Sequence, residues 1–270
     1  KPLEATLSNA DAMVEACAKR GVIFSGGALI KATPEIQETA SWIHKGKLGK
    51  LIGAAVLDWS REISGAGCHA ISVLRLLTGA EVEEVVAWGT PSDLLAADCD
   101  WNLVVNGHFK LSNGLDCPVF GQSSGKDMVD VWSDESLVRI KWGSEDGRPL
   151  NKPEMYTGFD KDGNRIKVDV RYEQYHWPQP RYLMGSILAF LKAVYKNNEK
   201  YLWISGHDLR QALEVAIASH QSAKHGSVPI KLPLKDRSLS LYPRPYRWLG
   251  GDEYTKLGVK VKGRRDDIDI

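Results

Sequence analysis

One histidine, His69, stands where a run of small residues gives way to a predicted helix within residues 64–79. Ile71, Leu74 and Leu77 recur on one face of that helix, and this spacing favours burial of the face in a core. An imidazole titrates near neutral pH and can exchange a proton with a reacting group. His69 is therefore a candidate general acid or base. The alternative is a half-buried histidine whose ring bonds only to nearby backbone.

A second group of candidates lies in Tyr175-His176-Trp177-Pro178, between a predicted strand and a predicted helix. His176 and Trp177 suit hydrogen bonding to, and stacking on, a sugar ring in a cleft. The alternative is a loop aromatic packed under neighbouring prolines. The loop after an earlier predicted strand carries further side chains that could reach the same cleft, or that are surface charges: Asp58, Trp59, Arg61 and Glu62.

Metal chemistry is not expected from this sequence. The remaining histidines show no ligand spacing with Asp, Glu or Cys: His44, His108, His207, His220 and His225. The four cysteines lie far apart, without a Cys-x-x-Cys pair, which argues against a zinc knuckle or a disulfide scaffold.

The overall charge is close to zero, with 35 Lys and Arg against 34 Asp and Glu. No global field is therefore expected to attract nucleic acid or an anionic membrane. No apolar run approaches the roughly 18 residues of a membrane-spanning helix, and no signal peptide is visible. We expect a cytoplasmic protein. Because the chain starts with Lys1 and not with Met, we also expect it to begin within a longer protein.

The elements that must position these side chains begin with a helix over residues 7–21 and a short buried strand over residues 22–24. A second helix is predicted to start at Pro34, with Thr33 as its N-cap, and to run to Gly46. This alternation is typical of one unit of a parallel sheet, which cannot bury both its faces alone.

Strand patterns dominate the middle of the chain, over residues 52–58, 82–88, 101–110, 128–140 and 165–172. Asn113-Gly114 and Asp162-Gly163 are typical of tight hairpin turns. The pattern predicts a mixed, largely antiparallel sheet.

Two more helices are predicted after the sheet. The first covers residues 182–195, with Met184, Ile187, Leu191 and Val194 expected to face inward. The second covers residues 205–226 and starts with a capping box formed by Ser205 and Asp208. Residues 229–234 are expected to form an extended edge.

Four pieces occur in an order that resembles a known family: Lys1-Pro2, Lys45-Gly46-Lys47-Leu48-Gly49, Gly67-Cys68-His69-Ala70-Ile71, and residues 214–234. The set is similar to the glucose–fructose oxidoreductase / inositol dehydrogenase (Gfo/Idh/MocA) family. The resemblance implies an α/β (α+β) chain in three parts. They are the C-terminal remnant of a Rossmann domain (residues 1–52), an open-sheet substrate domain with helices on one face (residues 53–250), and a polar tail (residues 251–270).

The resemblance also implies a chemistry, hydride transfer between a hydroxyl carbon of a sugar, polyol or glycoside and NAD or NADP. Lys1 would hold the reacting hydroxyl, and His69 would accept its proton. Lys1 and Pro2 would belong to the loop that contacts the cofactor. Trp59, Arg61, His176 and Trp177 would contact the substrate.

The sequence departs from the family at three points. Many members place an Asp four residues before the histidine and another three residues after it, whereas this chain has Gly65 and Ser72 there. No Gly-x-Gly-x-x-Gly fingerprint is present. We therefore expect the cofactor to be bound mostly by a region absent from this chain.

Two alternatives stay open. One is a non-catalytic accessory or assembly subunit that consists of the substrate domain only, and the other is a redox-assisted sugar lyase or glycosidase. The expected partners are a small sugar or polyol and a second copy of the chain, with neither nucleic acid nor membrane. Aromatic residues on the strands are predicted to give the sheet an apolar face for such a homo-oligomer: Trp88, Trp101, Trp132 and Trp142.

Overall fold

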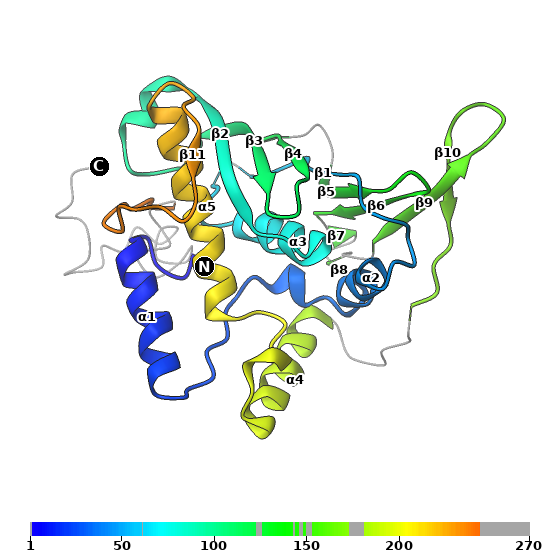
Figure 1. Ribbon diagram of the computed structural model, residues 1–270, viewed down its shortest axis with the longest axis horizontal. Coiled ribbons are helices and arrows are strands. Elements are labelled where there is room, and N and C mark those ends of the chain that lie inside the picture. The colour runs from blue at the N-terminus through cyan, green and yellow to red at the C-terminus, as the bar shows by residue number, and fades with distance from the viewer. Residues whose placement is uncertain are drawn as a thin grey trace.

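The computed structural model describes residues 2–60, 62–122, 126–142, 144–145, 148–149, 153–172 and 181–243. Their main feature is a 9-stranded mixed sheet with the order β10-β9-β6-β5-β1-β4-β3-β2-β11 (Figure 1). Its strands are β1 (Gly53–Val56), β2 (Val82–Thr90), β3 (Val104–Leu111), β4 (Asp116–Val119), β5 (Asp127–Trp132), β6 (Ser136–Lys141), β9 (Glu154–Phe159), β10 (Arg165–Val168) and β11 (Ile230–Lys231). A separate pair joins β7 (Ser144–Glu145) to β8 (Arg148–Pro149).

The central strand β1 is the point where the sheet changes direction. It pairs in parallel with β4 and antiparallel with β5, and the other described pairs of this sheet are antiparallel. All four residues of β1 are buried. Gly53 is required there because a Cβ would collide with the indole ring of Trp132 on β5. The predicted mixed, largely antiparallel sheet is confirmed.

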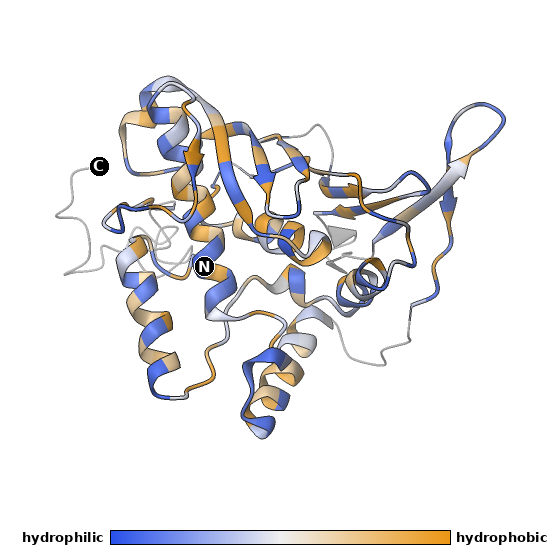
Figure 2. Cartoon of the chain, viewed as in Figure 1, coloured by the Kyte–Doolittle hydropathy of each residue, from blue (hydrophilic) through white to orange (hydrophobic). Residues whose placement is uncertain are grey.

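Most helices lie below the sheet in Figure 1, and α5 runs alongside β2. The helices are α1 (Leu7–Lys19), α2 (Pro34–His44), α3 (Cys68–Thr78), α4 (Arg181–Lys196) and α5 (Gly206–Lys224), with short 3-10 turns η1 (Leu29–Ala32), η2 (Ser92–Ala96) and η3 (Glu199–Tyr201). Helix α3 packs against β1, β5 and α5, and α5 packs along β2 and β3. Orange, hydrophobic residues alternate with blue ones along both helices and strands (Figure 2).

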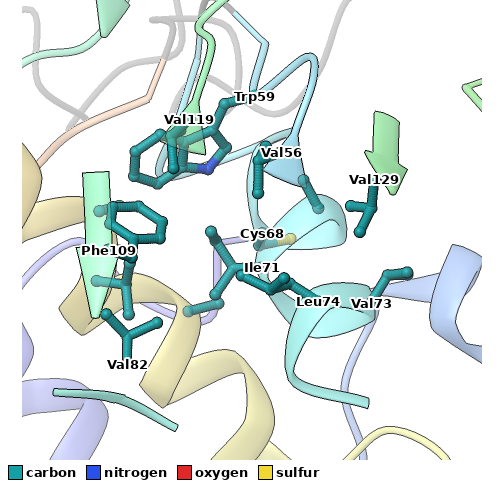
Figure 3. Packing of buried hydrophobic residues seen from close by; sticks show 14 of the residues in the cluster. Val56, Trp59, Cys68, Ile71, Val73, Leu74, Val82, Phe109, Val119 and Val129 are labelled. Carbon is teal, nitrogen blue, oxygen red and sulfur yellow. The ribbon is translucent and has the colours of Figure 1, made fainter. Parts of the chain in front are cut away.

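The core forms where α3 meets the sheet. Ile71, Leu74 and Leu77 of α3 are fully buried, as their spacing predicted. Ile71 lies on the side of Phe109 of β3, and Val73 lies on the side of Val129 of β5 (Figure 3). Gly79, whose φ is 63°, ends the helix in the left-handed conformation that a glycine adopts easily.

Several local predictions are confirmed. Thr33 is the N-cap of α2 and Pro34 its first residue, although the Thr33 side chain accepts no capping hydrogen bond. The Ser205–Asp208 capping box opens α5. The predicted edge contains β11, which pairs antiparallel with β2.

The predicted buried strand over residues 22–24 is wrong. Val22 is half exposed, and this segment makes only an isolated antiparallel bridge between Ser25 and Ser205. A parallel strand needs a neighbouring strand to take up its backbone hydrogen bonds. Beside this segment the described residues provide only the chain around Ser205, so an apolar run that suits a strand forms a single bridge and no strand.

The predicted single strand over residues 128–140 is two strands, β5 and β6, joined at Ser133. The Ser133 hydroxyl accepts hydrogen bonds from the backbone N–H groups of Glu135 and Ser136, which fixes a tight reversal. The predicted list also lacks β4, which has four residues, and β9, which has six.

The predicted inward face of α4 is wrong. Ile187, Leu191 and Val194 are exposed, whereas Ala189 and Ala193 are buried. The helix approaches its neighbours through its small residues, because a Cβ on Gly185 would lie 2.6 Å from the Ala32 carbonyl oxygen.

The predicted domain boundary near residue 52 stays a prediction. Apolar residues from both sides of it, such as Leu7 and Ile36 before and Leu74 and Leu213 after, belong to one hydrophobic cluster. The polar tail lies outside the described residues. In the described part of the chain, no helix is long and apolar enough to cross a membrane.

Candidate active site

The turn that leads into α3 positions His69. Backbone hydrogen bonds close this turn, from Gly67 N to Glu62 O over 2.9 Å and from His69 N to Ala66 O over 3.2 Å. A Cβ on Gly67 would lie 2.5 Å from the Ile63 carbonyl oxygen, so the close approach of the chain to itself requires glycine there. The turn places His69 in the first helical turn of α3.

His69 is only 5% exposed and lies beneath a tryptophan. Its ring contacts Trp142 edge to face, with the ring centroids 5.8 Å apart and an interplanar angle of 79°. Trp142 follows β6 directly, and its indole N–H donates a hydrogen bond to the Asp58 carbonyl oxygen over 3.0 Å. The Trp142 backbone N–H donates to the Lys126 carbonyl oxygen over 2.5 Å. The indole ring is thus held between the histidine and the loop that follows β1.

A cavity of about 340 Å³ opens beside this tryptophan. This volume lies at the lower end of the range of small-molecule sites. Its lining combines one aromatic ring with carboxylate, hydroxyl, amide and ammonium groups: Asp58, Ser60, Ala66, Gly121, Gln122, Lys126 and Trp142. An aromatic face surrounded by hydrogen-bonding groups suits a small hydroxylated ligand. Ala66, three residues before His69, links the cavity wall to the histidine turn.

Two effects act on the Asp58 carboxylate in opposite directions. Burial raises its pKa, and a hydrogen bond that Oδ1 accepts from the Ser60 backbone N–H over 2.8 Å lowers it, with burial the stronger effect. A carboxylate in these surroundings is a stronger hydrogen-bond acceptor for ligand hydroxyl groups than one in open solvent.

A buried carboxyl group holds the histidine turn in place through a hydrogen bond. Asp100, on the loop between η2 and β3, is fully buried, and its Oδ2 accepts a hydrogen bond from the Ser64 backbone N–H over 2.6 Å. Burial raises the pKa of Asp100 to about 7, and the nearby Glu62 carboxylate contributes to this rise. Asp100 N also donates to the Tyr242 carbonyl oxygen, so one residue connects the turn to the C-terminal part of the described chain.

The residues predicted from the sequence fall into four groups. His69 and the Asp58 loop come together around Trp142, as described above. Trp59 is fully buried and packs edge to face on Phe109, with ring centroids 5.3 Å apart (Figure 3). This burial in the core argues against the predicted substrate contact, because the strand-end loop turns the Trp59 side chain inward and leaves Asp58 at the cavity. Pro2 is partly buried at the start of the chain. Four predicted residues lie outside the described residues: Lys1, Arg61, His176 and Trp177.

The sequence did not single out Gln122 or Lys126, and it assigned Trp142 to an oligomer face. These residues follow β4, precede β5 and follow β6, and the pairing of β1 with β4 and β5, and of β5 with β6, brings them to the Asp58 loop. The available signal was a lysine just before β5 and a tryptophan just after β6, which lie together at the open end of the hairpin, and that signal is weak.

The glycines of the histidine turn do not form a dinucleotide site. A pyrophosphate site needs an open helix N-terminus with free backbone N–H groups. Here the Glu62 side chain occupies the place of a Gly65 Cβ, Trp59 and Ile63 occupy that of a Gly67 Cβ, and Cys68 is buried. The glycines of this turn are therefore crowded by their own chain and do not form a pyrophosphate site.

No protein-family model matches the sequence, and neither does any curated protein. Solved structures do match. An aldose-aldose oxidoreductase from Caulobacter crescentus, complexed with glycerol, is 17% identical with a TM-score of 0.63, over 86% of this chain and 70% of that one. A levoglucosan dehydrogenase in complex with NADH and levoglucosan is 16% identical with a TM-score of 0.62, over 87% of this chain and 72% of that one.

An inositol dehydrogenase homologue from Azotobacter vinelandii, complexed with NADH and myo-inositol, is 13% identical with a TM-score of 0.65, over 86% of this chain and 70% of that one. At these identities the likeness concerns the fold. The chain has the fold of Gfo/Idh/MocA-type sugar and polyol oxidoreductases, as the resemblance in its sequence implied.

Proposed function

We propose that this chain is the substrate-binding part of an NAD(P)-dependent oxidoreductase that acts on a hydroxyl group of a sugar, polyol or glycoside. Two observations support this function. The fold is that of proteins solved with glycerol, levoglucosan or myo-inositol, two of them together with NADH. The cavity at Trp142 combines an aromatic wall with several groups that bond to hydroxyls.

The single observation that carries the proposal is the contact of His69 with Trp142. The ring of His69 packs edge to face against the indole, the indole lines the cavity, and Ala66 belongs both to the cavity wall and to the histidine turn. A hydroxylated ligand on the indole face would receive hydrogen bonds from Lys126 and donate them to Asp58. Its reacting hydroxyl would then enter between Ala66 and Trp142 to reach the imidazole.

In this function, His69 accepts the hydroxyl proton while the carbon loses a hydride. A bound nicotinamide would supply the hydride acceptor. The glycines of the turn before α3 form no pyrophosphate site, so we assign to this chain only the substrate and proton side of the reaction. The roles of Lys1 in holding the hydroxyl, and of Lys1 and Pro2 in contacting the cofactor, rest on the resemblance alone.

Ligand binding tests the proposal directly. Tryptophan fluorescence of the purified chain would be titrated with myo-inositol, levoglucosan and glycerol. We expect saturable quenching by at least one of them and about ten-fold weaker binding for Trp142→Ala, which corresponds to ~1.4 kcal/mol. Trp88→Ala is the matched control, because Trp88 is an exposed tryptophan on β2 outside the cavity lining. No quenching by any of the three, or equal loss in both variants, would contradict the proposed site.

A second candidate function is a non-catalytic accessory or assembly subunit. It applies if no part of the protein binds a dinucleotide, since the glycines of the histidine turn form no pyrophosphate site of their own. The two functions differ in one measurement: reduction of NAD⁺ or NADP⁺ by the whole protein that contains this chain. Binding of a polyol without any such reduction would identify the accessory subunit. Cleavage of a glycoside without net reduction would identify the redox-assisted lyase or glycosidase.

A further inference from the structure

Two buried carboxyl groups lie on the histidine turn, and the proposed reaction uses neither of them directly. Glu62 and Asp100 are both 0% exposed. Asp100 reaches the turn from the loop between η2 and β3, and its Oδ2 accepts a hydrogen bond from the Ser64 backbone N–H over 2.6 Å. Burial of a carboxylate costs free energy unless its surroundings compensate for the lost water. Two such groups on one short turn therefore call for an explanation.

The Glu62 side chain lies against the next residue of the same turn. A Cβ on Gly65 would collide with the Glu62 carboxylate, so glycine is needed at this position to make room for it. Consecutive Cα atoms are only about 3.8 Å apart. A carboxyl that bonds to Ser64 and a carboxyl that touches Gly65 therefore lie in the same buried region. Burial raises the pKa of Asp100 to about 7, and the Glu62 carboxylate contributes to this rise.

The thiol of Cys99 responds to both carboxyl groups. Cys99 precedes Asp100 on the loop and is partly buried. Burial raises the pKa of its thiol, and the negative charges of Asp100 and Glu62 raise it further. One thiol can respond to both charges only if both lie near it, which supports a common location for the two carboxyl groups.

The other titratable groups next to Asp100 have separate contacts. Asp98, on the same loop, forms an ion pair with Lys224 of α5 over 3.2 Å. Tyr242 accepts the hydrogen bond from the Asp100 backbone N–H through its own backbone carbonyl oxygen. Asp98 is exposed and is therefore a suitable control for the two buried carboxyl groups.

We propose that Glu62 and Asp100 form a carboxyl pair that positions His69, and that the pair keeps the histidine turn closed only while one of its two carboxyls is protonated. Two negative charges in one buried region repel each other, so the second ionisation drives the Glu62 side chain away from Gly65. The backbone of Glu62 closes the turn, because its carbonyl oxygen accepts a hydrogen bond from the Gly67 N–H over 2.9 Å. Movement of Glu62 therefore opens the turn that places His69.

This inference rests on the proposed role of His69 as the proton acceptor, and it predicts a pH range for that role. His69 can accept a proton only as a neutral imidazole, which requires a sufficiently high pH. The carboxyl pair keeps its proton only at a sufficiently low pH. Turnover should therefore fall on the alkaline side, at a pH set by the pair and not by His69. Glu62 and Asp100 are positioning residues in this account.

Hydrogen exchange at the Gly67 amide of the purified chain tests the pair without any ligand or cofactor. We expect the exchange rate, divided by the intrinsic rate at each pH, to rise at least about ten-fold between about pH 6 and about pH 8. Glu62→Gln and Asp100→Asn should each remove this rise, because one charge then remains, and Asp98→Asn should keep it. Circular dichroism checks that the variants are folded. A constant ratio in the parent chain, or an unchanged rise in Glu62→Gln, would overturn the proposal.

Alkylation of Cys99 by iodoacetamide at a series of pH values gives a second measurement. The thiolate is the reactive form, so Glu62→Gln and Asp100→Asn should each move the onset of alkylation to lower pH. Cys17 on α1, read from its own peptide by mass spectrometry, is the internal control and should not change. An unchanged Cys99 profile in both variants would also overturn the proposal.

Turnover of the whole protein separates this inference from the proposed function. We expect the alkaline loss of turnover to move to higher pH in Glu62→Gln. An unmoved alkaline loss would contradict the positioning role of the pair. Absence of turnover at every pH would refute the proposed function, whereas the exchange and alkylation measurements would still decide whether the carboxyl pair controls the turn.

Discussion

Helices α3 and α4 have similar apolar stripes but opposite environments. Ile71, Leu74 and Leu77 of α3 face the sheet and are fully buried. Ile187 and Leu191 of α4 face outward, and that helix packs through its small residues. The comparison teaches that an apolar stripe predicts a helix but does not decide which face is buried. Close approach decides it, and the glycine and alanine residues control how closely a helix can approach.

The largest expected effect is a difference in the free energy of unfolding between a substitution in the apolar stripe of α3 and one in the apolar stripe of α4. Leu74→Ala should destabilise the protein by about 2–5 kcal/mol, because it leaves a cavity in the core. Leu191→Ala removes a side chain that is more than half exposed and should change the free energy of unfolding by less than about 0.5 kcal/mol. Urea denaturation of both variants measures the difference. Equal losses would mean that α4 is buried against another part of the protein.

The second prediction concerns the buried carboxyl behind α3. Because burial raises the pKa of Asp100 from 3.8 to about 7, the folded protein binds this proton more tightly than the unfolded chain. The stabilisation is complete below pH 3.8 and is lost as the pH rises to about 7, a change of up to ~4 kcal/mol. Asp100→Asn should remove this dependence of stability on pH between 3.8 and about 7, as measured by thermal unfolding at a series of pH values. Lys192→Gln on α4 is the control, and an identical slope in Asp100→Asn and the parent protein would disprove the assignment.

The third prediction tests the chemistry assigned to α3. In the protein that carries this chain, His69→Ala should lower turnover by about 10²-fold while the fold is retained. His108→Ala is the matched control, since His108 lies on the surface beside Asp116. Leu191→Ala should leave turnover unchanged. Near-normal turnover in His69→Ala would remove His69 from the reaction and leave it a structural residue under Trp142.

The smallest expected effect concerns the close packing of α4 at Gly185. Gly185→Ala should destabilise the protein by about 1–3 kcal/mol, because the new methyl group would meet the Ala32 carbonyl and the Trp203 ring. Gly27→Ala, where a Cβ meets no atom within 4 Å, should be close to neutral. Chemical denaturation of the two variants checks the contrast. A neutral Gly185→Ala would show that α4 can shift without loss of stability.

Much of the fold was predictable from local patterns. The apolar spacing of α3, the proline at the start of α2 and the Ser205–Asp208 capping box are local signals, and the structure confirms them. The segment at Val22 was mispredicted because a strand is defined by its neighbours and not by its own residues. The turn at Ser133 was missed because serine fixes it through side-chain hydrogen bonds, without a glycine or proline signal.

Less of the candidate site was predictable. The Gly-x-Gly-x-His turn indicated His69 as the functional candidate, and the loop after β1 indicated Asp58. Trp59, its neighbour, was assigned to the cleft but belongs to the core, since adjacent residues of a loop can point in opposite directions. Lys126 and Trp142 are 16 positions apart and carry no local signal.

By itself, the sequence determined which segments become helices, the mixed character of the sheet, and the placement of one histidine at a helix entry, because propensity, capping and periodicity act over a few residues. Only the tertiary structure decided that Trp142 covers His69, that Asp100 anchors the turn from behind, and that α4 exposes its large side chains. These features depend on contacts between residues far apart in the chain. Such contacts are set by strand pairing and by how closely the helices can pack.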